Sequence, residues 1–485
     1  MVTVASLIES TISTGQSRSA YGAMLKQVYG PAWSKWLHTD SGKISEKIAK
    51  KKGSMGGQMK VNAITTALPQ SAGMSLGEGS LLPMPVHGSY INPRIIARDF
   101  YTRLRWTGQS QRAARMGDKA AWARPKQNDV EDARAQSGLN FARKLYLGYY
   151  DILEVVETYN HGSTINDGTV LELYDRDTRR SGHTEGGGVV SDYHKFGGHY
   201  LREGMVLQSV LKASGLAGSA DTEATSNALG FKIDSIDLSD LANPSITVKL
   251  AEGSTDTTAV LPDSANELLI PFGSRRDSVT TGDTLDSDFY TFNGVQAVLQ
   301  GSDFYSHLYG LAKATYSKLS GVIDRSTAAN TDVRAYSELR SALMFDRIRN
   351  EGSGGKPDCI IVQDALLRGI VDATEDKRRF APVQKGEFGY GALQFTAGDT
   401  TTPIIADWLQ VPGQMLFLDS KQWGFYTESE LSPLDDPQTR FVTDKDQTEI
   451  TFHMSGNVEC MKPHSQGVID DLGFSAGDTI GTRSV

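Results

Sequence analysis

Cysteine is nearly absent from this chain, which has only Cys359 and Cys460 among its 485 residues. Two cysteines cannot form a disulfide framework, and both lie in apolar, strand-like stretches, where we expect buried and reduced thiols. No apolar run approaches the ~18–20 residues that a membrane-spanning helix needs. The first residues lack a basic region followed by a long apolar core, so we predict no secretory signal. We expect synthesis in a reducing cytoplasm and no membrane partner.

Motifs for catalysis or cofactor binding are also scarce. The chain has no Gly-rich loop ending in Gly-Lys-Ser or Gly-Lys-Thr, and no Gly-x-Gly-x-x-Gly between a strand and a helix. The metal-binding patterns His-Glu-x-x-His and Cys-x-x-Cys do not occur either. The three glycines Gly186–Gly188 have no lysine beside them and indicate a loop. These absences favour a protein without a cofactor.

The nearest approach to a metal site is a group of four residues in loop-like sequence, His183, Asp192, His194 and His199. The histidines are separated by eleven and five positions, which match no helical pair of ligands. We interpret them as surface or capping histidines. The sequence therefore predicts no catalytic, cofactor-binding or metal-binding residue and no enzymatic activity. A metal-dependent hydrolase using these four side chains is the alternative from another functional class.

Charge is distributed unevenly along the chain, whose net charge is −9. Residues 1–150 have 21 Lys and Arg against 9 Asp and Glu, whereas the remainder has 28 against 49. The two parts therefore carry +12 and −21. A protein that coats DNA tightly would be basic overall, because neutralisation of phosphates supplies that affinity. A self-associating protein with a basic arm and an acidic body fits this distribution better.

The most informative stretch runs from Pro357 to Tyr426. It begins with an apolar run that predicts a strand, Pro357-Asp358-Cys359-Ile360-Ile361-Val362, followed by a helical pattern over 365–371. Further strands are predicted at 403–407, 415–419 and 423–426, with a Pro-Gly turn at 411–414. Short apolar strands separated by such turns, with a helix between them, indicate one buried α+β core.

This succession resembles the axial domain of tailed-bacteriophage major capsid proteins with the Hong Kong 97-type fold. The resemblance covers 300–465 best and 94–156 less closely, and elsewhere it rests on the order of the parts. It implies an α+β fold with an N-terminal arm, an extended hairpin loop, a peripheral domain with a spine helix, an axial domain and, in this chain, a β-rich insertion. At this length the chain is expected to divide into two or three lobes.

The N-terminal 93 residues are predicted to form an arm and an extended linker. An apolar stripe at Tyr21, Met24, Leu25, Val28 and Tyr29 predicts a helix, and Trp33 and Trp36 follow it. Aromatic residues so close to a terminus pack either on the chain's own body or on a neighbouring subunit. Lysines between 43 and 52 form a basic face, and the Gly-, Ser- and Pro-rich stretch 53–89 is expected to be extended and irregular.

Residues 94–156 are interpreted as the extended hairpin loop. Apolar runs at 120–125 and 141–156 predict two strands, and the polar stretch 126–140 predicts the tip between them. The resemblance implies that this loop overlaps the next subunit, with Trp122, Arg124 and Arg134 as contact candidates beside Trp33 and Trp36. Some capsid proteins of the family join a Lys to an Asn covalently, but no context selects Lys119, Lys126, Asn128 or Asn140 as reactive.

The remaining regions are predicted in chain order. Residues 157–226 form the peripheral region with the spine helix between 195 and 214, and 227–300 form the β-rich lobe, with strands at 231–236, 245–250, 267–271 and 295–298. The axial domain covers 301–430 and begins with two helices. Their apolar faces are Phe304, Leu308, Leu311, Thr315 and Leu319 in the first and Tyr336, Leu339 and Leu343 in the second. Antiparallel strands in 431–485 return to the peripheral region.

The resemblance implies a major capsid protein that assembles from hexamers and pentamers into an icosahedral shell around double-stranded DNA, bound without sequence specificity. Scaffolding, portal and decoration proteins are further expected partners. The protein would be located in the virion after assembly in the host cytoplasm. An encapsulin-like cargo shell is the alternative within the same fold, and a secreted surface protein is a third possibility that the missing signal argues against.

Overall fold

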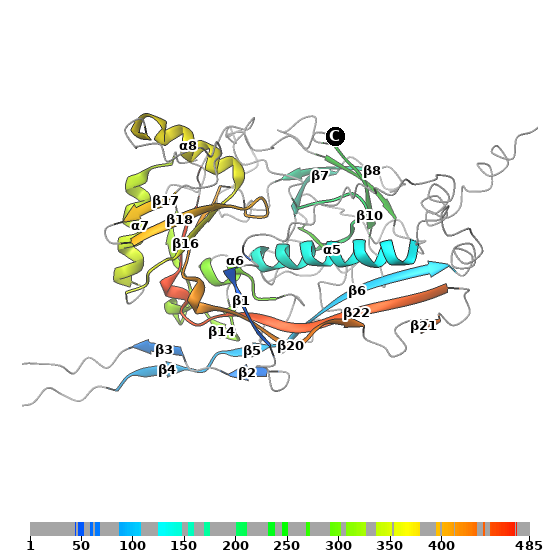
Figure 1. Cartoon of the computed structure of the whole chain (residues 1–485), viewed down its shortest axis with the longest axis horizontal. Coiled ribbons are helices and arrows are strands. Elements are labelled where there is room, and N and C mark those ends of the chain that lie inside the picture. The colour runs from blue at the N-terminus through cyan, green and yellow to red at the C-terminus, as the bar shows by residue number, and fades with distance from the viewer. Residues whose placement is uncertain are drawn as a thin grey trace, which may run out of the picture. The chain divides into compact units, whose positions relative to one another are not determined.

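The computed structural model describes residues 44, 47–52, 59–61, 64–67, 87–107, 125–147, 154–159, 169–174, 200–210, 231–237, 245–250, 268–271, 292–301, 307–325, 336–351, 354–378, 394–397, 400–411, 413–433, 440–441, 447–470 and 472. The chain divides into two compact units, and Figure 1 labels its helices and strands. The first comprises Met1–Ser41, Asp99–Phe141 and Ser429–Ser455, and the second comprises Gly42–Arg98, Ala142–Glu428 and Gly456–Val485.

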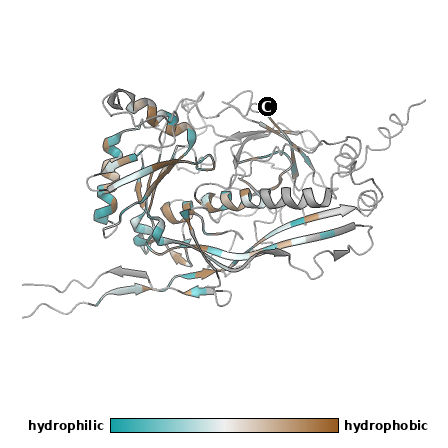
Figure 2. Ribbon diagram, in the orientation of Figure 1, coloured by the Kyte–Doolittle hydropathy of each residue, from teal (hydrophilic) through white to brown (hydrophobic). Residues whose placement is uncertain are grey.

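A six-stranded sheet forms the centre of the second unit. Its strand order is β15 (Val322–Asp324), β23 (Gly467–Ile469), β19 (Met415–Leu418), β16 (Cys359–Val362), β18 (Thr400–Ala406) and β17 (Gln394–Ala397). β16 pairs parallel with β18 and antiparallel with β19. Every residue of β16 and β19 is buried, because side chains on both faces of a central strand are covered. Figure 2 draws the middle of this sheet as apolar.

Two helices pack on this sheet. α8 (Asp364–Arg378) buries Ala365, Leu366, Leu367 and Ile370 in the core that also contains Ile360 and Phe417. The side chain of Gln363 accepts a hydrogen bond from the Ala365 N–H at 3.0 Å, which satisfies one of the free donors at the start of the helix. The strands at 357–362 and 415–419 and the helix at 365–371 are thus confirmed.

The other helix, α7 (Glu338–Glu351), exists as predicted but buries a different face. Ser341, Met344, Phe345 and Ile348 point into the core, whereas Leu339 is 69% exposed and Leu343 is 52% exposed. The predicted apolar face was therefore wrong, and only Tyr336, which precedes the helix, packs against the core. Two guanidinium groups hold the helix to the sheet: Arg347 donates to the Ile323 carbonyl, and Arg340 pairs with Asp324.

The helix predicted over 304–319 is wrong within the described residues. The structure has a two-stranded hairpin of β13 (His307–Leu308) and β14 (Leu311–Ala312), followed by the 3-10 turn η3 (Ser317–Leu319). Tyr309 and Gly310 between the strands have φ values of 53° and 77°. Positive φ at both turn residues is the geometry of a two-residue hairpin turn, so glycine at 310 overrides the helical spacing of the leucines.

The β-rich lobe is confirmed in type and is larger than predicted. Six strands close into a barrel in the order β10 (Phe231–Asp237), β11 (Ser245–Leu250), β8 (Thr169–Tyr174), β7 (Glu154–Tyr159), β12 (Leu268–Pro271) and β9 (Val206–Val210). Leu171, Leu207, Phe231, Ile246 and Leu269 are buried together in its interior. The barrel thus takes in β7, which was placed in the hairpin loop, and β8 and β9, which were placed in the peripheral region.

Two further predictions on secondary structure are corrected. Residues 295–298 form the short helix α6 (Val295–Leu299) and not a strand, with all five of its residues buried. The spine helix predicted between 195 and 214 is absent from the described part of that range, 200–210, which holds a turn and the strand β9. The apolar residues in this range fitted a helical spacing imperfectly because they belong in part to a barrel strand, in which side chains alternate between two faces.

The longest described helix lies outside the range predicted for the spine helix. It is α5 (Pro125–Leu147), which spans 23 residues. The polar stretch 126–140 is therefore helical, and the hairpin tip predicted there was wrong. Pro125 occupies the first helical position and Gly148 follows the last, an arrangement typical of helix ends. The last turns bury Ala142, Leu145, Tyr146 and Leu147.

A five-stranded sheet contains the longest strands. Its order is β1 (Ala49–Lys52), β20 (Trp423–Pro433), β22 (Gln447–Cys460) and β21 (Arg440–Phe441), and β6 (Arg98–Thr107) also pairs with β22. β21 and β22 are antiparallel, which confirms the predicted C-terminal pair. β1 pairs in parallel with β20, so part of the predicted basic arm belongs to this sheet.

Candidate functional site

A two-stranded ribbon occurs where the sequence predicted an irregular linker. β2 (Met59–Val61) pairs with β5 (Arg94–Ile96), and β3 (Ile64–Ala67) pairs with β4 (Ser89–Ile91), both antiparallel. The register continues from one pair to the next, because Val61 faces Arg94 and Ile64 faces Ile91, three residues further along each strand. We call residues 59–67 and 89–96 the ribbon (Figure 1). It is not the hairpin that was predicted at 94–156, which it overlaps only at Arg94–Ile96.

The described ribbon strands pair only with each other. Val61 is 51% exposed and Tyr90 is 64% exposed, so large apolar side chains point to solvent on this element. An isolated two-stranded hairpin is at best marginally stable in water. Exposed apolar side chains on such an element are typical of a surface that another chain covers.

The start of the ribbon is held to the five-stranded sheet by Lys60. Its ammonium lies 2.8 Å from Glu459 Oε2 and 3.2 Å from the centroid of the Tyr426 ring. The Glu459 side chain is 1% exposed and that of Lys60 is 18% exposed. A carboxylate buried to this extent requires a cation or several donors, because burial removes its hydration.

The returning strand of the ribbon is held by two other residues. Asn457 Nδ2 donates to the Ile96 carbonyl at 2.7 Å, while its Oδ1 accepts from the N–H groups of Asn293 and Val458. The Tyr309 carbonyl accepts from the Arg94 N–H at 2.9 Å. Tyr309 Oη also accepts from the Cys460 N–H at 2.7 Å. A non-glycine residue at positive φ costs about 1–3 kcal/mol, so the surrounding contacts must hold Tyr309 in place.

A second junction joins the N-terminal segment to the six-stranded sheet. Ile44 and Ile48 are buried against a small cavity that Val295, Cys359 and Trp423 help to line. The Ile44 N–H donates to Asp407 Oδ2 at 3.4 Å, and Tyr146 Oη donates to the same atom at 2.6 Å. Burial, and next the Asp407 charge, raise the pKa of Tyr146 well above its usual value. This phenol therefore stays a donor at any physiological pH.

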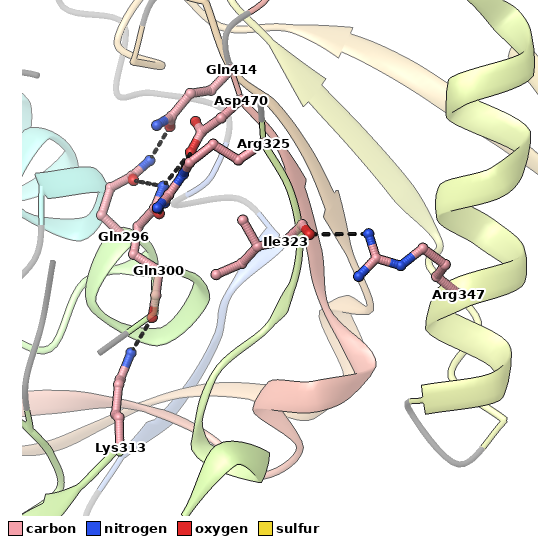
Figure 3. Close-up of polar contacts among 8 residues, drawn as sticks. All are labelled: Gln296, Gln300, Lys313, Ile323, Arg325, Arg347, Gln414 and Asp470. Carbon is pink, nitrogen blue, oxygen red and sulfur yellow. Dashed lines mark hydrogen bonds and ion pairs between the residues drawn. The ribbon is translucent and has the colours of Figure 1, made fainter. Parts of the chain in front are cut away.

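A buried polar network fixes α6 within the same unit (Figure 3). Lys313 Nζ donates to the carbonyls of Ala297 and Gln300 at the end of α6, where a cation complements the helix dipole. The network continues through side-chain hydrogen bonds: Gln296 donates to Gln414, and Arg325 donates to Gln300. Gln300 in turn donates to Gln296 and to Asp470. These bonds join segments around α6, β15, β19 and β23, and they indicate a structural role.

The two thiols are buried and free, as predicted. Burial, and next the Asp358 charge, raise the pKa of Cys359 to about 12. Burial is also the main cause that raises the pKa of Cys460. Because the thiolate is the reactive form, neither residue is suited to nucleophilic chemistry at neutral pH.

The predicted contact residues fall mostly outside the described part of the chain. Trp33, Trp36, Trp122 and Arg124 lie outside it, and Arg134 lies in the part of α5 before residue 136, where only the backbone is described. The four residues of the alternative metal site, His183, Asp192, His194 and His199, also lie outside it. Among the described residues no cluster of three or more His, Cys, Asp or Glu side chains could hold a metal ion. No helix among them is both long and apolar enough to cross a membrane.

The residues that hold the ribbon were not predicted. Lys60 and Glu459 are 399 positions apart in the chain, and no local pattern relates them. Only the Tyr309-Gly310 pair gave a usable signal, because glycine in the second of two turn positions favours a hairpin. The alternation of Asn457 and Glu459 with apolar residues was a weaker sign of a strand with two different faces.

No protein-family model and no curated protein matches the sequence. Solved structures resemble it along nearly its whole length at low identity. The capsid asymmetric unit of cyanophage A-1(L) has a TM-score of 0.49 and 10% identity, covering 92% of this chain and 96% of that chain. The capsid of an empty GTA particle has a TM-score of 0.44 and 8% identity, covering 95% of this chain and 100% of that chain. A structure from Mycobacterium phage Adephagia has a TM-score of 0.38 and 9% identity, covering 97% of this chain and 98% of that chain.

Proposed function

We propose that this chain is a major capsid protein of a tailed bacteriophage, which assembles into an icosahedral shell enclosing double-stranded DNA. The observation that carries the proposal is the ribbon at 59–67 and 89–96, a paired arm with exposed Val61 and Tyr90. Such an arm gains stability only when another surface covers it. A second copy of the chain is the partner that a shell provides at every position.

The rest of the architecture supports the same role. The long helix α5, the long strands β6, β20 and β22, and the six-stranded sheet with α7 and α8 match the parts that a Hong Kong 97-type subunit requires. Each contact between copies need bury only several hundred Å² per partner, because every subunit makes several contacts and closure makes them cooperative. The role is structural and not catalytic.

The proposal includes partners and location. Packaged DNA would be bound without sequence specificity. The part of the chain with a net positive charge is the first 150 residues, which have 21 Lys and Arg against 9 Asp and Glu. Scaffolding, portal and decoration proteins would join the hexamers and pentamers of the shell. The protein would act in the virion after assembly in the host cytoplasm.

We keep five residues as candidates for contacts between subunits: Trp33, Trp36, Trp122, Arg124 and Arg134. The arginines would meet acidic groups of a neighbour, and each exposed pair contributes about 0–1 kcal/mol. Repetition around the shell multiplies this contribution. Arg124→Glu combined with Arg134→Glu should lower the melting temperature of the shell or prevent assembly, with unchanged circular dichroism of the subunit. An unaltered melting temperature and salt response would remove both arginines from the interface.

Electron microscopy and sedimentation of the purified full-length protein test the function directly. We expect capsomers, closed shells or aggregates, because the ribbon exposes apolar side chains that a single copy does not cover. A stable monomer at micromolar concentration, with no regular particles on the grids, would contradict the proposal. Shells filled with a protein cargo, and empty of DNA when purified from infected or lysogenic cells, would favour the encapsulin-like alternative.

A further inference from the structure

We propose that Lys60, Tyr309, Asn457 and Glu459 form a clamp that fixes the direction in which the ribbon leaves the five-stranded sheet. The clamp holds both strands of the ribbon at its base. Lys60 secures β2, while Tyr309 and Asn457 secure β5. Its existence depends only on the subunit, whereas its consequence for a shell rests on the proposed function.

The first step is the placement of the two groups on β22. Asn457 and Glu459 are two positions apart on one strand, so their side chains project from the same face. Both residues are 1% exposed. One donates to the Ile96 carbonyl of β5, and the other accepts from the Lys60 ammonium of β2. A single face of one strand therefore holds both strands of the ribbon.

The second step concerns the charge pair. Lys60 places its ammonium between Glu459 and the face of the Tyr426 ring, and the Tyr426 side chain is buried. A cation over an aromatic face and beside a buried carboxylate is held from two directions. The partners differ in access to water, because the Lys60 side chain is 18% exposed and that of Glu459 is 1% exposed. Lys60 can turn toward solvent when the pair is broken, whereas Glu459 cannot.

The third step is the turn between β13 and β14. Tyr309 keeps a φ of 53° while its carbonyl accepts from Arg94 and its hydroxyl accepts from Cys460. The residue thus links the start of β5 to the end of β22. A backbone conformation of this kind persists where surrounding contacts determine it. Together with Asn457 it holds β5 at Arg94 and Ile96, so this strand cannot pivot about a single hydrogen bond.

The consequence is a fixed base for an arm that reaches a neighbour. Lys60, Arg94 and Ile96 all lie at the base of the ribbon, and the exposed residue Tyr90 lies further along it. A small rotation at the base moves the outer part of the ribbon by a larger distance. If the ribbon contacts a second copy, the clamp sets the angle between adjacent subunits and thereby the curvature of the shell.

Amide hydrogen exchange of β5 tests the clamp in full-length protein, compared in the same assembly state for every variant. Lys60→Met keeps the aliphatic stem on Tyr426 and removes the charge, and we expect exchange at Arg94–Ile96 to become at least about tenfold faster. Glu459→Gln should have a smaller effect, because Lys60 then turns to water. Lys60→Met combined with Glu459→Gln should recover most of the protection lost in Lys60→Met, and Lys60→Arg should retain it.

The matched control is an ion pair between Arg103 of β6 and Glu449 of the same strand β22. Arg103 pairs with Glu449 at 2.8 Å, and its side chain is 61% exposed. Arg103→Gln should leave exchange at β5 unchanged, since exposed pairs contribute little. Equal exchange at β5 in Lys60→Met and in wild type would overturn the clamp. Additive effects of the two single changes in the double variant would also overturn it, because the pair would then not act as a unit.

Particle images separate this inference from the proposed function. If wild type forms shells, Lys60→Met should give shells of mixed size or open sheets, and Lys60→Arg should give shells of normal size. Shells of normal, uniform size in Lys60→Met, with fast exchange at β5, would mean that the clamp does not set curvature. If wild type forms no particles, the proposed function fails, and the exchange results still decide whether the clamp exists.

Discussion

At the scale of single residues, His464 makes stability depend on pH. Burial lowers the pKa of His464 below its usual 6.5, and the nearby cations Lys318 and Lys462 lower it further. The folded state therefore favours the neutral imidazole, whereas the unfolded chain takes up a proton as the pH falls through about 6.5. The stability conferred by the neutral ring is complete above this pH and decreases below it, until the lowered folded-state pKa is reached.

We predict that His464→Gln reduces the loss of thermal stability between pH 7.5 and pH 5. Glutamine keeps a polar side chain but cannot take up the proton, so its melting temperature should fall less over this range than that of wild type. Thermal unfolding followed by circular dichroism at several pH values measures the difference. Parallel curves for the two proteins would assign the acid sensitivity to other groups. Asp364 is not one of them, because burial raises its pKa and protonation of such a carboxyl as the pH falls favours the folded state.

Gly456 is a residue at which backbone strands approach closely. A Cβ atom at this position would lie 2.6 Å from the Tyr426 carbonyl oxygen and 3.1 Å from Phe425 Cζ. Gly456→Ala must therefore displace β20 from β22, and overpacking of this kind costs about 1–3 kcal/mol. Chemical denaturation checks this value. Gly369→Ala in α8 is the control, because its Cβ meets nothing within 4 Å and alanine should stabilise the helix by about 0.5–1 kcal/mol.

At the scale of elements, α7 shows how an apolar stripe can mislead. Leucines at 339 and 343 suggested the buried face, but the chain buries the neighbouring stripe, which includes Phe345 and Ile348. Phe345 stacks on Phe395 at 5.6 Å and meets Phe417 edge-on at 5.4 Å. These two aromatic partners lie on the strands β17 and β19 of the six-stranded sheet. Only the assembled sheet therefore decides which stripe of α7 is buried.

The two stripes of α7 predict opposite outcomes for similar substitutions. Phe345→Ala should lower the free energy of unfolding by about 3–5 kcal/mol, because it leaves a cavity among aromatic rings. Leu339→Ala should change the free energy of unfolding by no more than about 0.5 kcal/mol, because this side chain is exposed. Urea denaturation of both variants provides the comparison. A large effect of Leu339→Ala in a particle but not in the dissociated subunit would place that residue in a contact between copies.

At the scale of the whole molecule, the N-terminal arm is not a separate appendage. If the arm predicted in the first 93 residues stood apart from the subunit body, a deletion of residues 1–52 would leave the folded subunit intact. The structure contradicts this expectation, because Ile44 and Ile48 are buried, the Ile44 N–H contacts Asp407, and β1 pairs with β20. The residues that belong to the fold therefore begin before position 52.

We predict that two deletions separate assembly from folding. Removal of residues 1–41 keeps Ile44, Ile48 and β1, and should preserve the melting temperature of the subunit while impairing regular shell formation. Removal of residues 1–52 should also destabilise the subunit, since each buried isoleucine contributes about 1.5–3 kcal/mol. Thermal unfolding and electron microscopy of both proteins test this. Equal subunit stability in the two deletions would show that the docked segment is dispensable.

The sequence by itself determined the α+β class, the core strands predicted at 357–362 and 415–419, the helix predicted over 365–371, the free buried thiols and the β-rich lobe. These features depend on contiguous apolar runs and on local turn residues, which a linear pattern records. Even so, local signals were missed at α5, where Pro125 and Gly148 mark a helix that the polar composition of 126–140 concealed.

Only the tertiary structure decided the ribbon, the closed barrel and the clamp. Strand pairing brings Lys60 to Glu459 across 399 positions, and the barrel closes through pairs between strands that are distant in the chain. Sequence periodicity shows which face of an element is apolar, but it does not show which other element covers that face. The ribbon and its clamp therefore became visible only when the partners of each strand were known.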